Sequence, residues 1–172
     1  MTLGLLIVRL IAGLTMAAHG GQKLFGWFDG PGRRGTASMM ERLGFREPAV
    51  MASLAGLAEL AGGLGLAVGF LTPFAAIAIV VVMLNAAFTV HLKNGFWNTA
   101  GGYEYPLVMS AIAVGIASTG AGDASADNAL GFLGALSGDA WAAIVVVVAV
   151  VASTLTMAVG RRHQQLPGHP VR

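Results

Sequence analysis

Five stretches of the chain are apolar, and each is long enough to cross a lipid bilayer as a helix. Three of them, 73–90, 105–122 and 140–160, contain no charged residue. Two more, 3–25 and 48–71, are interrupted in their interiors by Arg9, His19 and Glu59. About 20 helical residues, at ~1.5 Å each, span the ~30 Å of hydrocarbon. The pattern therefore predicts five transmembrane helices.

The loops between these stretches differ in charge, which predicts their sidedness because cytoplasmic loops accumulate Lys and Arg. The basic residues of the loops and tail are Lys23, Arg33, Arg34, Arg42 and Arg46 in the first loop, Lys93 in the third, and Arg161, Arg162 and Arg172 in the tail. The fourth loop carries only Asp123, Asp127 and Asp139. We therefore expect the amino terminus outside and the carboxyl terminus in the cytoplasm. A four-span topology is less favoured, because it would place the basic tail on the same side as the acidic fourth loop. A cleaved signal peptide is also a poor interpretation of residues 1–20, because no basic segment precedes the apolar run in this chain.

Composition excludes several classes of protein. The chain is 56% hydrophobic and only 10% charged, a composition that excludes a soluble globular protein. Its 25 glycines favour close contact between membrane helices. Its net charge is +2, and the basic residues are in positions that set membrane orientation, so nucleic-acid binding is not indicated. With no cysteine, the chain has no thiolate for zinc, iron–sulfur or disulfide chemistry. A redox role therefore requires a bound cofactor or a partner.

We expect an all-α membrane protein, a four-helix transmembrane bundle with a fifth transmembrane helix at the carboxyl end. The predicted units are 1–127 for the four-helix domain, 128–160 for the additional helix and 161–172 for a basic cytoplasmic tail. A tight turn at 71–73 should join the second and third spans. In the first loop, Ser38 and Glu41 have the spacing of a capping box for a short interfacial helix, and a solvated loop is the alternative.

Arg9 and Glu59 are the charged residues deepest in the predicted spans. Counted from the outer ends of their helices, they lie ~9 Å and ~18 Å deep, which suggests a buried ion pair. Such a pair would either fix the packing of the two helices or leave Glu59 as a proton-accepting carboxylate in a ligand pocket.

Polar and aromatic residues near the cytoplasmic side are candidates for a cofactor site. Two histidines at neighbouring levels, His19 and His91, could ligate haem, although lone histidines near helix ends more often act as hydrogen-bonded anchors. A quinone fits better, because its carbonyl oxygens need a few donors among apolar walls. The alternative is an ordinary interfacial belt of polar and aromatic side chains, and no metal site is indicated. The candidate residues are His19, Lys23, Glu59, Asn85, His91, Trp97 and Tyr103.

Three signatures in order resemble the DoxX family of small bacterial membrane proteins. The first is AHGGQKLFG at 18–26, and the second is AGLAE at 55–59. The third consists of TVHLKNGF at 89–96 followed by GGYEYP at 101–106. The resemblance covers about 5–127 and implies a bundle of four membrane helices. It also implies a link to redox processes, including quinone-reducing thiosulfate oxidation in relatives and complexes with detoxifying enzymes in mycobacteria. The matching polar positions are Arg9, His19, Gln22, Lys23, Glu59, His91, Asn94, Tyr103, Glu104 and Tyr105, and the fifth helix departs from the family pattern.

The leading hypothesis is a subunit of a redox system in the bacterial inner membrane. It would bind a quinone or similar lipid-soluble carrier and work with a soluble oxidoreductase that docks on the basic first loop. The alternative is a non-catalytic membrane scaffold that recruits partner proteins. Solute transport has less support, because there is one deep acidic residue and no pair of broken helices. The sequence leaves the electron donor and the oligomeric state open, and a homo-oligomer is compatible with it.

Overall fold

The computed structural model describes residues 2–160, so the predicted basic tail lies outside the described residues. Within 2–160 every regular element is helical, as expected from the sequence. The five long helices are α1 (Thr2–Phe25), α3 (Pro48–Val68), α4 (Thr72–Ala86), α5 (Glu104–Thr119) and α7 (Asp139–Gly160). The shorter elements are η1 (Trp27–Asp29), α2 (Gly32–Arg42), the π-helical turn η2 (Ala87–His91), η3 (Leu92–Asn94), η4 (Asn98–Ala100) and α6 (Ala126–Ala129).

Four helical segments in the described part are long and apolar enough to span a membrane. They are α1, α3, the continuous stretch from α4 to η3, and α7. The fifth apolar helix, α5, has 16 residues and is therefore ~24 Å long, less than the ~30 Å of hydrocarbon. The protein is thus an all-α membrane bundle in which one of the five predicted spans is shorter than the others.

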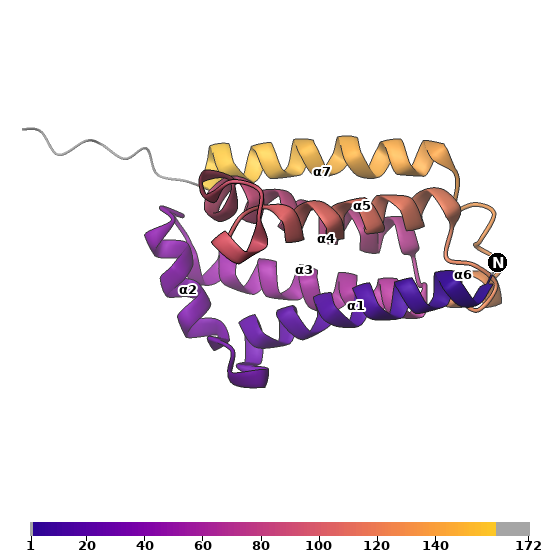
Figure 1. Ribbon diagram of the computed structural model, residues 1–172, viewed down its shortest axis with the longest axis horizontal. Helices are drawn as coiled ribbons and strands as arrows, with labels where there is room; N and C mark the ends of the chain where they lie inside the picture. Colours follow the sequence, from indigo (N-terminus) through magenta and orange to yellow (C-terminus); the bar gives the residue numbers. More distant parts are fainter. Residues whose placement is uncertain (1, 161–172) are drawn as a thin grey trace, which may run out of the picture.

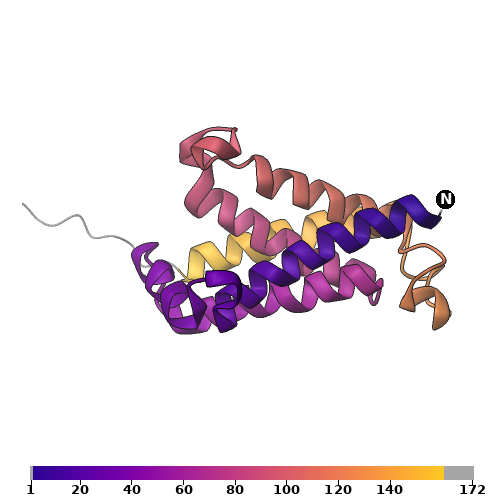
Figure 2. The same ribbon diagram turned by 60° about the horizontal axis from the view of Figure 1, so that its bottom comes forward.

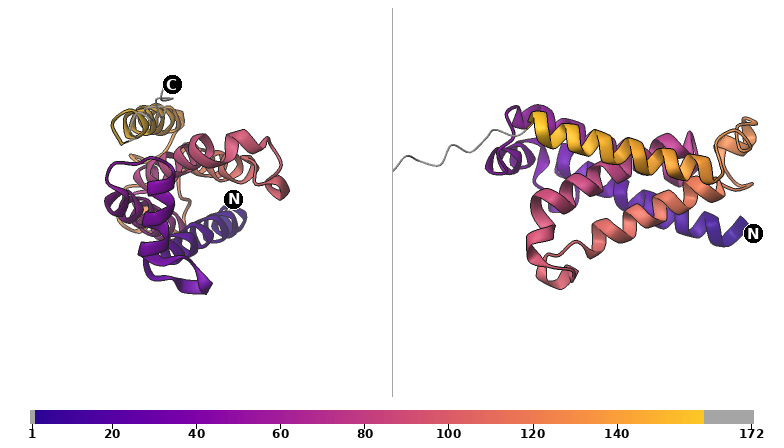
Figure 3. Two further views of the ribbon diagram at one scale, coloured as in Figure 1. Left: turned by 90° about the vertical axis from the view of Figure 1, so that its left-hand side faces the viewer. Right: turned by 90° about the horizontal axis from the view of Figure 1, so that it is seen from above.

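The long helices pack in two groups. One group is the pair α1 and α3, and the other contains α4, α5 and α7, with α3 and α4 joining the two groups (Figure 1, Figure 3). The core between them is built from buried aliphatic residues of several helices, including Met16, Leu66, Ile79 and Val145. α7 therefore packs directly on α4 and α5 and is an integral part of the bundle.

Glycines bring α1 and α3 into backbone contact. A Cβ atom on Gly13 would lie 2.5 Å from the carbonyl oxygen of Gly63, and one on Gly20 would lie 2.4 Å from the amide nitrogen of Leu60. Such distances exclude any side chain, because real Cβ contacts are much longer. These positions fix the antiparallel register of the pair, consistent with the packing role expected from the glycine content.

The loops gather at the two ends of the bundle as their charges predicted. α2, the 87–103 segment and the end of α7 lie at one end, whereas the amino terminus, the α3–α4 turn and the 120–138 segment lie at the other (Figure 1, Figure 2). A main-chain hydrogen bond of 2.8 Å from Arg46 to the carbonyl of Gly160 links the first loop to the end of α7. The loops with basic residues therefore share one end of the molecule.

The short helix in the first loop is present but begins earlier than the capping-box spacing indicated. α2 starts at Gly32, so Ser38 lies inside the helix instead of capping it. Thr36 explains the difference, because its buried hydroxyl donates to the carbonyl of Gly32 at 2.9 Å and lies 3.2 Å from that of Lys23. This contact holds the first turns of α2 against the end of α1.

Candidate functional site

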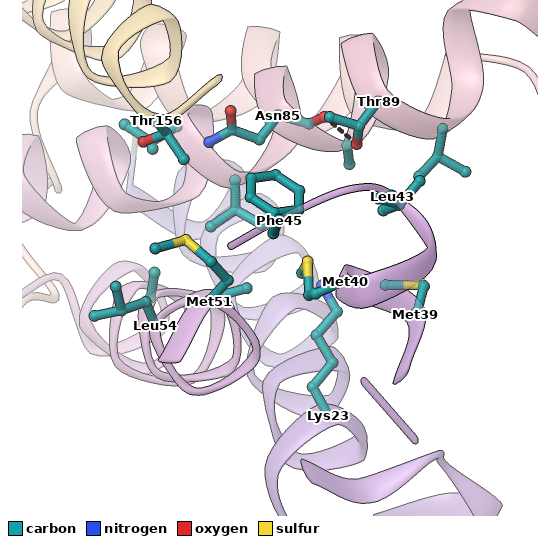
Figure 4. Close-up of a pocket in the computed structure, with 16 residues that line it drawn as sticks. Lys23, Met39, Met40, Leu43, Phe45, Met51, Leu54, Asn85, Thr89 and Thr156 are labelled. Carbon is teal, nitrogen blue, oxygen red and sulfur yellow. Dashed lines mark hydrogen bonds between the residues drawn. The ribbon is translucent and has the colours of Figure 1, made fainter. Parts of the chain in front are cut away.

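A cavity of about 310 Å³ lies at the end of the bundle that carries α2. It is lined by residues of α1, α2 and the loop after it, α3, α4, the π-helical turn and α7, and Figure 4 shows its sixteen lining residues. All but four of these are apolar, and the exceptions are Lys23, Asn85, Thr89 and Thr156. An apolar cavity of this size with a few polar groups is typical of small-molecule sites.

Asn85 is the polar group of the cavity with an unsatisfied atom. Its side-chain oxygen is buried and has no hydrogen-bond partner among the described residues. By contrast, Thr89 and Thr156 donate to the carbonyls four residues before them, at 2.7 and 2.8 Å. Since a buried acceptor without a partner costs ~1–3 kcal/mol, Asn85 is a natural contact for a ligand that can hydrogen-bond.

Lys23 reaches the cavity from α1, opposite Asn85 and Thr89 (Figure 4). Its ammonium nitrogen lies 2.5 Å from Oε1 of Glu59 and forms an ion pair with it. An ammonium has three donors, and the pair accounts for one of them. Because Glu59 balances the charge of Lys23, the cavity is suited to a neutral ligand with a hydrogen-bond acceptor.

The predicted ion pair between Arg9 and Glu59 is wrong. Arg9 is 1% exposed and donates from Nε to the carbonyl of Ala67 at 3.0 Å. Its terminal nitrogens donate to the carbonyls of Ala121 and, at 2.6 Å, Ala124. Arg9 therefore ties the end of α3 to the segment after α5.

The register of α1 against α3 is the physical reason for this error. Gly13 lies opposite Ala67 and Gly20 opposite Leu60, which places Glu59 near position 21 of α1. Arg9 is about twelve residues from that level, or ~18 Å at ~1.5 Å per residue. Counting from the predicted helix ends had suggested about half that separation, which an arginine side chain could have covered.

His19 lies about one helical turn before Lys23 on α1 but does not line the cavity. Its ring packs against that of Tyr105 with a centroid distance of 5.5 Å, and Tyr105 is within electrostatic range of Glu59. The structure thus brings His19, Lys23 and Glu59 together, and adds Tyr105 of α5 to the group.

The other predicted site residues form a separate, internally bonded loop. Nδ1 of His91 donates to the carbonyl of Gly101 at 2.7 Å, which defines the protonated ring nitrogen because a carbonyl only accepts. Tyr103 and Trp97 pack edge-on against Phe96, and Trp97 is 65% exposed. Of the seven predicted cofactor residues, two line the cavity, Lys23 and Asn85, and five do not, namely His19, Glu59, His91, Trp97 and Tyr103.

Several lining residues were not predicted as parts of a site. Phe45 is buried at the cavity and packs on the end of α7, where a Cβ on Gly160 would meet its ring at 3.1 Å. The sequence indicated an apolar surface on the first loop but contained no signal that this surface would face α4 and α7. The unpredicted lining residues with large or polar side chains are Met39, Met40, Leu43, Phe45, Met51, Leu54, Thr89 and Thr156.

The family model for DoxX matches residues 4–92, just over half of the chain. The protein belongs to the DoxX family. No curated protein and no solved structure matches it. The DoxX match contains Lys23, Glu59 and Asn85, but it ends before α5 and α7. Thr156 and the Phe45–Gly160 contact therefore depend on a helix outside the DoxX match.

Proposed function

We propose that this multi-pass DoxX protein binds a quinone or a similar neutral, lipid-soluble carrier in the cavity. The observation that carries the proposal is the buried amide of Asn85, whose Oδ1 has no partner among the described residues, opposite Lys23 in a cavity with mostly apolar walls. A quinone has carbonyl oxygens that accept hydrogen bonds and a ring that matches apolar walls. Lys23 would donate to one carbonyl, and the Asn85 amide, turned to present its NH₂ group, would donate to the other.

The shape of the lining supports this class of ligand. Three methionines, Met39, Met40 and Met51, adjust easily to irregular apolar shapes, and Phe45 offers an aromatic face. When bound, a quinone would supply the two-electron redox chemistry that the cysteine-free chain lacks. The residues of this chain would bind and orient the ring and exclude water from it.

We further propose that the protein lies in the bacterial inner membrane, with its amino terminus outside and the cavity near the cytoplasmic face. A soluble oxidoreductase would dock at this end, where Arg33, Arg34 and Arg42 of α2 and Arg46 are exposed. The positive-inside rule supports this orientation. The partner would exchange electrons with a carrier that enters from the lipid.

The test is to purify the protein in mild detergent, record oxidised and dithionite-reduced spectra, and analyse extracted lipids for quinones. We expect a quinone to copurify in near-stoichiometric amount, with no haem band. Equilibrium dialysis with menadione then measures affinity. Asn85→Leu should weaken binding about tenfold, since losing a buried hydrogen bond costs ~1–1.5 kcal/mol.

Asn98→Leu is the matched control, because Asn98 is exposed in the loop and does not line the cavity. It should bind menadione like the wild type. Absence of any copurifying quinone, together with equal affinity of the Asn85→Leu and wild-type proteins, would contradict the proposal. That result would favour the alternative, a non-catalytic scaffold.

A further inference from the structure

Lys23 connects the cavity to a buried carboxylate. Among the described residues it is the one side chain that both lines the cavity and pairs with Glu59. The side chain of Lys23 is 22% exposed and that of Glu59 is 2% exposed. A ligand that contacts Lys23 therefore also affects Glu59, its ion-pair partner, whose carboxylate has almost no contact with solvent.

Lys23 is the one ion-pair partner of Glu59 among the described residues. Oε1 accepts from the ammonium at 2.5 Å, whereas Oε2 is buried and has no hydrogen-bond partner in the described part of the chain. An ionised carboxylate at membrane depth is costly unless it is paired and hydrogen-bonded. Weakening its one ion pair favours the protonated, neutral carboxyl.

The neighbouring helices offer few other groups that could stabilise the charge. α1 also presents His19, which contacts Tyr105 of α5, and Tyr105 interacts electrostatically with Glu59. The helical residues of α4 include no ionisable side chain, and Asp139 of α7 lies at the far end of that helix. The charged residues of α2 are exposed, and they are Arg33, Arg34, Glu41 and Arg42.

We propose that ligand binding in the cavity is coupled to proton uptake by Glu59. The inference rests on the proposed function, because it requires a neutral ligand whose oxygen accepts a hydrogen bond from Lys23. An ammonium shared with that oxygen holds Glu59 less strongly, so Glu59 takes a proton from water. The proton comes from the solvent, an O–H bond forms on Glu59, and no electron moves.

The direction of the pH dependence follows from linkage. If the complex binds more protons than the free protein, lowering the pH favours the complex. Affinity should therefore rise as the pH falls, by up to about tenfold per unit for one proton taken up. A hydrogen bond between ligand and Lys23 that left the ion pair intact would give no such dependence.

The experiment is calorimetric titration of the purified full chain with menadione in phosphate and in Tris. These buffers differ in ionisation enthalpy, so the difference in measured heat counts the protons exchanged. Menadione suits the test because the chain contains no cysteine with which it could react. We expect uptake of up to about one proton per ligand in the wild type and tighter binding at pH 6 than at pH 8.

Glu59→Gln should bind menadione with no proton uptake and no dependence on pH. Lys23→Met provides a second variant, which removes both the ion-pair partner of Glu59 and a lining residue of the cavity, and it should likewise show no proton uptake. Glu47→Gln is the control, since Glu47 is exposed, and it should retain the uptake. Binding without proton exchange in the wild type, or equal uptake in Glu59→Gln, would overturn this inference alone. Absence of binding would overturn the proposed function and this inference with it.

Discussion

Arg9 and Glu59 are both buried charges, but their surroundings reduce the energetic cost of burial in different ways. Arg9 donates to three main-chain carbonyls at one end of the bundle. Glu59 has one ammonium partner and one oxygen without a partner. A planar guanidinium with five donors can satisfy several carbonyls at once, and the Asp127 carboxylate also interacts electrostatically with Arg9. The two residues therefore act in separate places, one in loop attachment and the other beside the cavity.

Asp127 acts at the same end as Arg9. Its carboxylate accepts from the amides of Leu71 and Thr72, at 2.7 and 3.0 Å, and from the Thr72 hydroxyl at 2.5 Å. It thereby caps the first turn of α4 from a distant part of the chain. The fourth loop thus has a structural role, because it holds the turn between α3 and α4.

A double-mutant cycle should distinguish the observed ion pair from the one expected from the sequence. Lys23→Met and Glu59→Gln should be non-additive in the free energy of unfolding, with a coupling of ~0.5–3 kcal/mol because the side chains touch. Arg9→Gln and Glu59→Gln should add within ~0.5 kcal/mol because they are far apart. Reversible unfolding in mixed micelles provides the measurement. A larger coupling for Arg9 with Glu59 than for Lys23 with Glu59 would show the described register to be incorrect.

At the scale of elements, the contact between α1 and α3 determines where the polar side chains meet. Gly56 accepts Leu24 and the base of Lys23 against its backbone, and Gly20 approaches Leu60. Membrane helices gain little from hydrophobic association, so close packing of this kind contributes much of their attraction. The same contact directs Lys23 toward Glu59.

Replacing glycines of this contact with alanine should destabilise the bundle. Gly13→Ala or Gly63→Ala places a Cβ within about 2.5 Å of the opposite backbone, so the helices must separate. We expect a loss of ~1–3 kcal/mol, typical of overpacking, and a lower unfolding temperature. Gly4→Ala and Gly115→Ala are matched controls, because nothing lies within 4 Å of the added atom. Equal stability of the Gly13→Ala and Gly4→Ala variants would argue against the backbone contact.

The carboxyl-terminal helix completes the cavity from outside the DoxX match. Thr156 lines it, and the main-chain bond from Arg46 to Gly160 holds the segment before α3 on the end of α7. Ser153, which is buried, lies 3.2 Å from the carbonyl of Val81 on α4. α7 is therefore a wall of the candidate site as well as a membrane helix.

At the scale of the whole molecule, the two ends of the bundle differ in chemistry. One end carries α2, the 91–103 loop and the cavity, and the other carries Arg9 and Asp127 with the main-chain groups they bind. Ligand-accessible polar groups and an amphipathic helix are found at the first end. The second end holds loops together by hydrogen bonds to buried charges.

Single cysteines in the naturally cysteine-free chain should map these ends to the two sides of the membrane. Arg34→Cys and Asn98→Cys should react with a membrane-impermeant maleimide from the cytoplasmic side, and Asp123→Cys from the outside. The physical reason is that Lys and Arg are retained in the cytoplasm during insertion. Labelling of Arg34→Cys and Asn98→Cys from opposite sides would contradict the arrangement of the loops.

The sequence by itself determined the helical class, the membrane location, the tight α3–α4 turn and the grouping of the loops. These follow from the length of apolar runs and the placement of charges, which are local properties of the chain. It also identified Lys23 and Asn85 as candidates, because polar side chains in apolar helices are few.

The tertiary structure alone decided which of these side chains meet. The partner of Glu59 depends on the register of α1 against α3, and a shift of a few residues along either helix would exchange Lys23 for another group. Register is set by contacts between Gly13, Gly20 and the opposite backbone, and no pattern along a single helix reports it. For the same reason, the cavity could not be predicted from the sequence, because it is lined by five segments that are distant along the chain.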